Sequence, residues 1–406
     1  MRIALISLLL AGFPALASAE TLTLDQVIKD SLQKNTGIYQ AQRAYEDRIA
    51  DATEAKQFDN PELNADAIRS RGNGGTGADF ELTQPLKLSQ ISGSRSRYAD
   101  LLGEVAGTEQ QYEILKVINE TTILYTQVWL LQERKRLYET YADDADKMKK
   151  LVNASASQGQ TSPAAAHLFS SDAAKLRADA RAVNAELRQT RTELGRKTGR
   201  AYQTVELSRP VFSAVPQDPE QLQKFAETRS NLRNVVKNRL KAAEQRLSVA
   251  EQDGALPEIG PRVLYSRAAD GGEDAYGFGI ALRIPLWNQN DAERKRATAE
   301  VKQARAETDL FNQLPQKDLI TELGLSASAM QERTTSYFDE ILPGYRKSYE
   351  LTRSMFRQGQ ASALEVWQVR EKLLGSENEA LDAVAQAVNA RGALELELGG
   401  KLEEIK

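Results

Sequence analysis

Large apolar residues alternate with small or polar ones between Tyr276 and Ile284. The apolar set is Tyr276, Phe278, Ile280, Leu282 and Ile284, and the residues between them are Gly277, Gly279, Ala281 and Arg283. A two-residue period predicts a β-strand with one large apolar face and one small or polar face. The pattern fits a strand of an ordinary half-buried sheet, and it equally fits a membrane β-barrel strand with lipid on one side and water on the other.

Three further stretches alternate in the same way, so we predict two β-hairpins, each with a glycine-rich loop. The first hairpin has strands at about 61–68 and 78–86, and the second has strands at about 257–266 and 275–286. Proline lacks the N–H that helices and sheets need, so it marks their ends. We therefore expect strand-to-helix joints at four prolines, which are Pro61, Pro85, Pro257 and Pro285.

Helical spacing fills most of the remaining chain. One helix is expected over about 25–57 and another over about 220–253. No proline interrupts residues 89–156, where apolar residues recur at steps of three and four, which predicts a coiled-coil helix about 100 Å long at ~1.5 Å per residue. A glycine turn at Gln158–Gln160 then reverses the chain, so we predict a helical hairpin over about 89–198.

The whole plan occurs twice, as residues 20–200 and 220–406, joined by a proline-containing linker at 201–219. The second helical hairpin covers about 290–399 and turns at Gly359. Corresponding residues are offset by 196 to 200 positions; the pairs are Asn35 with Asn231, Pro61 with Pro257, Pro85 with Pro285, and Gly159 with Gly359. An internal repeat of this length is a property of the fold rather than of one local motif.

Two prolines distinguish the second copy. Pro315 and Pro343 fall within its long helical stretch, whereas the first long helix has no proline. We expect a kink or a break at each of them.

Composition favours helices and argues against a nucleic-acid partner. The 406 residues are 41% hydrophobic, 6% aromatic and 27% charged, a balance typical of helices rich in Ala, Glu, Lys, Leu and Arg. The net charge of -4 is close to neutral and predicts no general affinity for nucleic acid.

The N-terminus has the features of a cleaved secretory signal peptide over residues 1–19. Arg2 precedes an apolar run from Ile3 to Leu16, and Ala17-Ser18-Ala19 is an A-x-A cleavage site. A buried N-terminal helix is the alternative. No later segment approaches the ~20 apolar residues of a spanning helix. The sequence contains no cysteine, so disulfides, thiolate metal sites and a lipid-modified cysteine are excluded, and we do not expect a lipoprotein.

Four strands cannot close a barrel by themselves. In a bilayer, an open sheet would leave unpaired N–H and C=O groups along its edges, which is strongly unfavourable. Closure then requires several copies of the chain. Three copies related by cyclic symmetry would give twelve strands, although the sequence alone does not fix that number.

The order and spacing of several short motifs resemble the TolC-like outer-membrane efflux protein family, over essentially the whole mature chain. The motifs are PL at 85–86, PLWN at 285–288, QGQTS at 158–162, ILP at 341–343 and RQGQAS at 357–362. The PLWNQN sequence is more similar to the heavy-metal efflux branch than to other branches.

The resemblance implies a mainly α-helical fold with a membrane β-barrel. Each chain would contribute a duplicated helix–β-hairpin–long helix–turn–helix repeat to a homotrimer. The trimer would form a 12-stranded barrel in the outer membrane, continued by a periplasmic α-helical barrel. The implied partners are outer-membrane lipid, a periplasmic membrane-fusion adaptor protein and an inner-membrane efflux pump of the RND type.

The turns at Gly159-Gln160 and Gly359-Gln360 have two compatible interpretations. Glycine reaches positive φ without strain, so chain reversal alone explains it at both turns. The resemblance also places both turns at the periplasmic tip, where an adaptor docks. We add the apolar residues Leu364 and Val366, just beyond the second turn, to this candidate docking surface.

Glu365 is the main candidate for a lumenal gate, with Asp172 as a second. The family often has an acidic residue facing the lumen near the closed tip, and threefold symmetry would turn it into a ring of three carboxylates that attracts cations. A glutamate on a solvated helix face is the alternative. His167 is the only histidine, so we expect no zinc or copper site. No motif indicates an enzyme or a cofactor.

We therefore expect an outer-membrane exit channel of a tripartite efflux system, which passively conducts metal ions, drugs or other small toxic compounds. An outer-membrane channel for type I protein secretion has the same architecture and is the first alternative. A non-conducting periplasmic coiled-coil scaffold is the alternative from another class.

Overall fold

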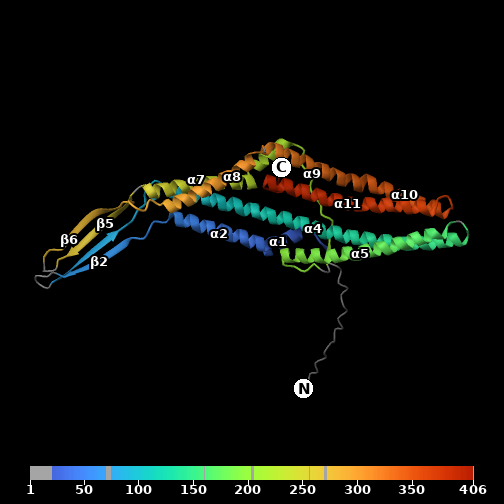
Figure 1. Ribbon diagram of the computed structural model, residues 1–406, viewed down its shortest axis with the longest axis horizontal. Helices are drawn as coiled ribbons and strands as arrows, with labels where there is room; N and C mark the ends of the chain where they lie inside the picture. The colour runs from blue at the N-terminus through green and yellow to red at the C-terminus, as the bar shows by residue number, and fades with distance from the viewer. Residues whose placement is uncertain are drawn as a thin grey trace, which may run out of the picture. The chain divides into compact units, whose positions relative to one another are not determined.

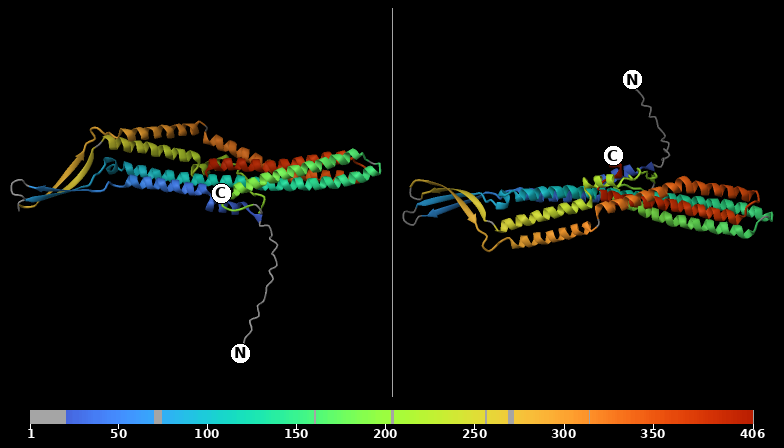
Figure 2. Two further views of the ribbon diagram at one scale, coloured as in Figure 1. Left: turned by 60° about the horizontal axis from the view of Figure 1, so that its bottom comes forward. Right: turned by 90° about the horizontal axis from the view of Figure 1, so that it is seen from above.

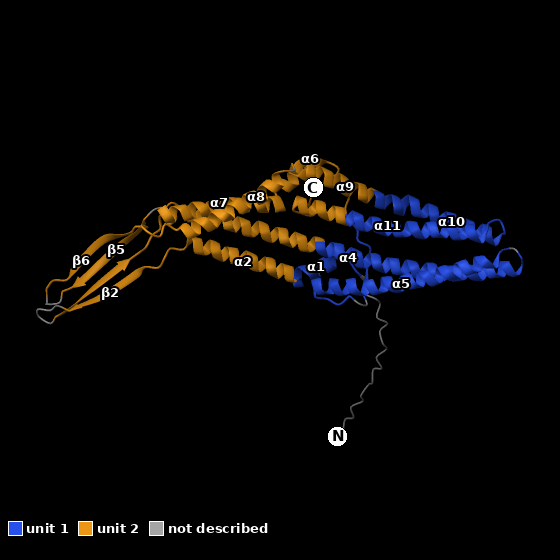
Figure 3. Cartoon of the chain, viewed as in Figure 1, with its two compact units in different colours: residues 1–35, 120–212, 333–388 blue, residues 36–119, 213–332, 389–406 orange. Residues whose placement is uncertain are grey.

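The computed structural model describes residues 21–69, 75–159, 161–202, 205–255, 257–268, 272–313 and 315–405. The expected signal peptide of residues 1–19 lies outside this part. The chain folds into two compact units (Figure 3). Unit 1 comprises Met1–Asn35, Glu120–Phe212 and Arg333–Val388, and unit 2 comprises Thr36–Asn119, Ser213–Glu332 and Asn389–Lys406.

Unit 1 is built from long helices (Figures 1 and 2). Its elements are α1 (Leu24–Lys34), the second part of α4 (Ser94–Ser157), α5 (Pro163–Thr198), the π-helix η1 (Tyr337–Ile341), α10 (Leu342–Arg357) and most of α11 (Ala363–Leu398). The apolar positions spaced by three and four residues meet in its core. One cluster joins Met148 of α4 and Phe169 of α5 to Phe356 of α10 and Val366 of α11.

A short parallel pair of strands ties the start of the described chain to the linker between the repeats. Strand β1 (Thr21–Leu22) pairs with β4 (Glu206–Leu207). The hydroxyl of the fully buried Tyr125 lies 3.0 Å from the carbonyl oxygen of Leu22 and 2.8 Å from that of Ser208. The linker expected at 201–219 is therefore ordered in part by this pairing.

Unit 2 combines helices with a four-stranded antiparallel sheet (Figure 1). Its helices are α2 (Thr36–Lys56), α3 (Leu88–Ile91), the first part of α4, α6 (Pro219–Glu227), α7 (Leu232–Ala255), α8 (Asp291–Asn312), most of α9 (Gln316–Ser336), the end of α11 and the 3-10 helix η2 (Leu402–Glu404). The strands are β2 (Glu62–Arg69), β3 (Thr76–Thr83), β5 (Glu258–Arg267) and β6 (Ala275–Arg283), in the order β2-β3-β5-β6. Both hairpins thus join one sheet.

Three helices expected to be continuous are broken. The helix expected over 25–57 divides at Asn35, which has an extended backbone (ψ 129°), and the one expected from 220 divides at the matching Asn231. Both asparagines are buried and bond to nearby groups, Asn35 to the Ser31 hydroxyl at 3.3 Å and Asn231 to the Ala226 carbonyl at 3.0 Å. The helix expected from residue 89 divides at Gly93, whose φ of +73° is incompatible with a right-handed helix.

Of the kinks or breaks expected at the two prolines of the second repeat, the break at Pro315 is confirmed, whereas at Pro343 the helix changes form without a gap. Helix α8 ends at Asn312 and α9 begins at Gln316, on either side of Pro315. Pro343 lies in the first turn of α10, directly after the π-helix η1. The Leu342 N–H bonds to the Tyr337 carbonyl across the π-helix, so α9 continues into α10 and Pro343 lies beside a local change in the helical hydrogen bonding. Among the described residues, no helix combines the length and the apolar character needed to cross a bilayer.

Candidate functional site

The register of the sheet in unit 2 brings most of the large apolar residues of its four strands to one face. Leu63 of β2 pairs with Leu82 of β3, which pairs with Val263 of β5, which pairs with Phe278 of β6. The next row contains the stacked rings of Phe80 and Tyr265, 6.1 Å apart, and the tilted ring of Tyr276, 5.2 Å from Tyr265. Most of this face is exposed in the single chain; the exposed members are Leu63, Phe80, Leu82, Val263, Tyr276, Phe278, Ile280 and Leu282.

The exposure of this apolar face continues to the base of the sheet. The side chain of Phe278 is 87% exposed, and that of Trp287, just after the strand, is 93% exposed. A contiguous apolar surface of this kind is unfavourable in water and marks contact with lipid or protein.

The opposite face of the sheet is mostly polar, with Ile68 and Leu264 as its large apolar residues. Its charged members are Glu62, Asp66, Asp79, Glu81, Glu258, Arg262 and Arg283. Arg262 binds Glu81 at 3.3 Å and lies across Gly279, where an added Cβ would come within 3.0 Å of its Nε atom. Arg283 of β6 lies 3.3 Å from Glu258 and 3.8 Å from Glu62 of β2. Side chains of the two outer strands thus converge over this face, and glycines leave room for them.

Strands β2 and β6 are the outer strands of the sheet and pair on one side only within the described chain. Pro61, Pro85, Pro257 and Pro285 each lie between a strand and a helix, as expected: one residue before β2 and β5, and two residues after β3 and β6. An outer strand with an unpaired edge is a template for another strand. The sheet is therefore incomplete at both edges.

In unit 1, the two helix-reversing turns have the same backbone geometry. Gly159 and Gly359 have φ of +72° and +73°. After α10, the N–H of Gln360 donates to the Met355 carbonyl at 2.8 Å, closing the end of the helix as in a Schellman motif. An added Cβ would meet nothing within 4 Å at either glycine, so backbone conformation alone requires glycine. Gln160 lies outside the described residues, and Gln360 is exposed.

The two apolar residues expected in the docking surface differ in their exposure. Leu364 is 52% exposed, whereas Val366 is 0% exposed. Val366 packs with Met148 and Phe169 in the core of unit 1. Because a fully buried side chain cannot contact a partner, including Val366 in the docking surface is wrong, and only Leu364 is retained.

Glu365 lies exposed at the start of α11, and its carboxylate accepts a hydrogen bond from the Ser362 N–H at 2.6 Å. The Ser362 hydroxyl accepts one from the Glu365 N–H at 3.2 Å, which completes a capping box. The N–H bond holds the pKa of the Glu365 carboxyl below its usual value. The Ser-x-x-Glu pattern was visible in the sequence, and the prediction of a gate overlooked this helix-capping role.

Asp172 does not present a free carboxylate. It binds the guanidinium of Arg370, and Arg370 is 0% exposed. Arg370 also donates to the carbonyl of Tyr141 at 2.5 Å and lies over the Tyr141 ring, 5.3 Å from its centroid. The carboxylate of Asp172 is therefore paired with Arg370 within unit 1, and the assignment of Asp172 as a lumenal, cation-attracting group is wrong.

Helices α4 and α10 add further members to this buried polar cluster. Asp144 of α4 accepts a hydrogen bond from the Tyr349 hydroxyl of α10 and lies 3.4 Å from Arg353 and 3.6 Å from Arg370. Burial raises the pKa of the Tyr349 hydroxyl, which therefore donates as a neutral phenol. In the sequence, Arg370 follows Val366 by four residues and precedes Leu373 by three, so it occupies a core position of α11. A charge at a core position is the feature from which the buried polar cluster could have been predicted.

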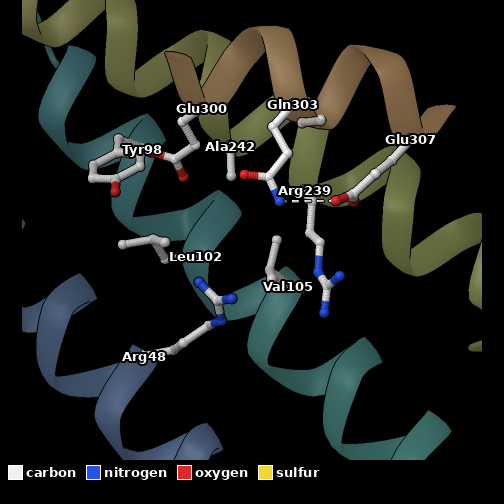
Figure 4. A pocket seen from close by; sticks show the side chains of 10 residues that line it. Arg48, Tyr98, Leu102, Val105, Arg239, Ala242, Glu300, Gln303 and Glu307 are labelled. Atoms are coloured by element: carbon white, nitrogen blue, oxygen red, sulfur yellow. Dashed lines mark hydrogen bonds between the residues drawn. The ribbon is translucent and has the colours of Figure 1, made fainter. Parts of the chain in front are cut away.

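A cavity of about 280 Å³ lies in unit 2 where α2, α4, α7 and α8 meet (Figure 4). Arg48 of α2 and Arg239 of α7 line it and both bind Glu109, at 2.8 and 2.6 Å. On α8, Gln303 donates to Glu307 at 3.0 Å (Figure 4). These charged groups are engaged with one another, and we assign the cavity no ligand.

His167 is exposed on α5, and no group of His, Cys, Asp and Glu among the described residues is arranged to hold a metal ion.

Known structures share this architecture. VceC, an outer membrane protein of Vibrio cholerae, is 17% identical with a TM-score of 0.70, covering 93% of this chain and 96% of its own. The outer-membrane channel OprN is 18% identical with a TM-score of 0.70, over 94% and 90% of the two chains. The open state of the Neisseria gonorrhoeae MtrE outer membrane channel is 14% identical with a TM-score of 0.65, over 93% and 89%.

No protein-family model matches the sequence, and no curated protein matches it significantly. The structural matches cover nearly the whole of both chains. The chain therefore has the TolC-like outer-membrane channel fold, and the resemblance indicated by its sequence motifs is confirmed at the level of the fold. The neighbours are channel proteins and not enzymes.

Proposed function

We propose that the protein is the outer-membrane exit channel of a tripartite efflux system. The observation that carries this proposal is the sheet of unit 2, which has one exposed apolar face, one polar face and two unpaired edges. Lipid would cover the apolar face, and the polar face would line a water-filled passage. Substrates would move through it passively, after export of the chain and removal of residues 1–19.

The unpaired edges are satisfied if copies of the chain pair edge to edge. Neighbouring strands in the sheet are antiparallel throughout. Because each chain contributes an even number of strands, β6 of one copy meets β2 of the next in antiparallel orientation, and the alternation continues around a closed ring. A homotrimer would give the twelve strands that the resemblance implies.

The remaining assignments follow the resemblance. The helical tip with Gly159, Gly359, Gln360 and Leu364 would receive a periplasmic adaptor, and an RND-type inner-membrane pump would supply the energy. Heavy-metal efflux is the branch that PLWNQN favours. Type I protein secretion is the second candidate, because it uses the same architecture. Metal, drug or solvent sensitivity of a deletion strain supports efflux, whereas loss of one exported protein supports secretion.

A matched pair of lysine substitutions tests the assignment of the two faces. Phe278→Lys adds a charge to the apolar face, and Asn64→Lys adds one to the polar face; both side chains are exposed in the single chain. On a lipid-facing strand, an added lysine costs about 2–4 kcal/mol near the bilayer midplane. Phe278→Lys should therefore reduce the amount of protein in the outer-membrane fraction, and Asn64→Lys should leave it unchanged. Equal levels of both variants would contradict a lipid-covered face.

A further inference from the structure

The apolar face of the sheet ends in two arginines. Strands β2 and β5 are the first strands of the two hairpins, and their last residues are Arg69 and Arg267. In β2, Arg69 is an even number of residues from Leu63, and in β5, Arg267 is an even number from Val263. Alternate residues of a strand point to the same side, so both arginines lie on the apolar face. Among the residues of β2, β3, β5 and β6, they are the only charged ones on that face.

Small side chains lie between the two arginines. Strand β3 separates β2 from β5, and it places Thr76 beside Arg69 and Ala78 beside Arg267. The two outer strands of this trio are about 10 Å apart, and Arg69 lies two residues, about 7 Å, beyond the level of Arg267 in the register. The Cα atoms of the two arginines are therefore roughly 12 Å apart. Both arginines are exposed, and neither forms an ion pair with another described residue.

An aromatic row adjoins the arginines on the side of the large apolar residues. It consists of Phe80, Tyr265 and Tyr276, and Tyr265 precedes Arg267 by two residues. On membrane-spanning strands, aromatic residues gather where the lipid tails give way to the headgroups. The hairpin end of the strands is the end away from the helices of unit 2 (Figure 1), so it faces outward in the proposed channel. The arginines then lie at the level of the outer-leaflet headgroups.

One carboxylate lies near this pair. Asp274 directly precedes Ala275, which pairs with Ser266, the residue before Arg267. The Asp274 carboxylate accepts a hydrogen bond from the Tyr265 hydroxyl at 2.7 Å, and it forms no ion pair with Arg267. Both guanidinium groups are therefore available to an anion.

We propose that Arg69, Arg267 and the aromatic row form a binding site for a phosphorylated glycolipid of the outer leaflet, the lipid A part of lipopolysaccharide. A guanidinium group can bind phosphate through two parallel hydrogen bonds, which suits arginine better than lysine. Two arginines set well apart suit a headgroup with two phosphates, and the acyl chains would continue along the apolar face. The inference rests on the proposed function and names the lipid that the outer boundary of the channel recognises.

Lipid binding to the purified, delipidated oligomer tests this site. Lipid A with both phosphates, lipid A without phosphates and phosphatidylglycerol would be added separately, and bound lipid would be counted by native mass spectrometry. The wild type should bind bisphosphorylated lipid A at least tenfold more tightly than either other lipid. Arg69→Gln/Arg267→Gln should lose at least tenfold in affinity for it. Inorganic phosphate at the same concentration should leave the bound lipid unchanged.

Two further variants complete the test. Arg283→Gln is the control, because Arg283 lies on the polar face at the other end of the sheet and its side chain is 70% exposed. This variant should bind lipid A as the wild type does. Arg69→Lys/Arg267→Lys keeps both charges but loses the paired hydrogen bonds, so its affinity should be intermediate even if the glutamine variant fails to insert into membranes.

Conductance recordings separate this inference from the proposed function. A conducting wild type that binds lipid A no better than Arg69→Gln/Arg267→Gln does would overturn the lipid site and leave the channel proposal standing. Equally tight binding of dephosphorylated lipid A or phosphatidylglycerol, or displacement by inorganic phosphate, would also overturn it. A wild type that forms no channel would overturn both proposals. Normal conductance steps of the glutamine variant, together with its loss of lipid A, would support the site.

Discussion

We expect a single substitution at Arg370 to destabilise unit 1 more than one at any other residue. Its side chain is fully buried and holds Asp172 of α5 close to Asp144 of α4. A buried charge whose partner is removed is strongly destabilising, because the remaining charge has lost both water and its counter-ion. The cluster therefore stabilises unit 1 only as long as all of its members are present.

Arg370→Met should lower the free energy of unfolding by about 3–5 kcal/mol. Arg305→Met is the control: Arg305 of α8 binds Glu244 of α7 at 2.9 Å, and the two side chains are 60% and 48% exposed, so its loss should cost at most about 1 kcal/mol. Thermal or denaturant unfolding of the purified protein measures both. The double variant Arg370→Met/Asp172→Leu should recover part of the loss. Equal losses for Arg370→Met and Arg305→Met would show that the cluster is not buried in solution.

Glu365 has two separable roles, a helix cap and a candidate gate charge. Glutamine preserves the capping box, whereas alanine removes it. Glu365→Gln should leave the start of α11 as protected from hydrogen exchange as in the wild type, and Glu365→Ala should not. If the charge also attracts cations, both variants should lower cation selectivity in single-channel recordings equally. Unchanged selectivity in both variants would leave Glu365 with its capping role alone.

At the scale of elements, the two helix-reversing turns depend on backbone conformation rather than on packing. Gly359→Ala should destabilise the protein by about 1–2 kcal/mol, since alanine is strained at a φ of +73°. Gly375→Ala is the control: Gly375 lies within α11, and an added Cβ there meets nothing within 4 Å. It should instead stabilise the helix by about 0.5–1 kcal/mol. Unfolding measurements that give the same sign for both variants would contradict the assigned turn geometry.

The helices and strands also show how much of the fold could be predicted from the sequence. Strands at 62–69, 76–83, 258–267 and 275–283 lie within a few residues of those expected, because a period of two has no helical alternative. The sequence does not predict the breaks at Asn35 and Asn231, although these two asparagines occupy matching positions in the two repeats. Asparagine is tolerated inside helices, and only its buried hydrogen bonds in the folded chain favour an extended residue.

The site residues were harder to predict than the elements. The sequence shows that Val366 and Asp172 lie on helices near the turns, but it does not show which side of each helix faces a neighbour. Burial of Val366 and pairing of Asp172 depend on α4, α5 and α11 meeting, which are contacts between distant parts of the chain. The glycines of the turns were predictable, because their requirement is local.

At the scale of the whole molecule, the central claim is that copies of this chain form a water-filled passage across the outer membrane. The two faces of the sheet and its unpaired edges are difficult to satisfy in any other setting. A non-conducting periplasmic scaffold would have to cover the same apolar face with protein.

Reconstitution of the purified protein into a planar lipid bilayer tests this claim most directly. The account predicts discrete, stepwise increases in conductance as single oligomers insert, and no such steps with heat-denatured protein. A protein that fractionates with the soluble periplasm and leaves the bilayer conductance unchanged would contradict it.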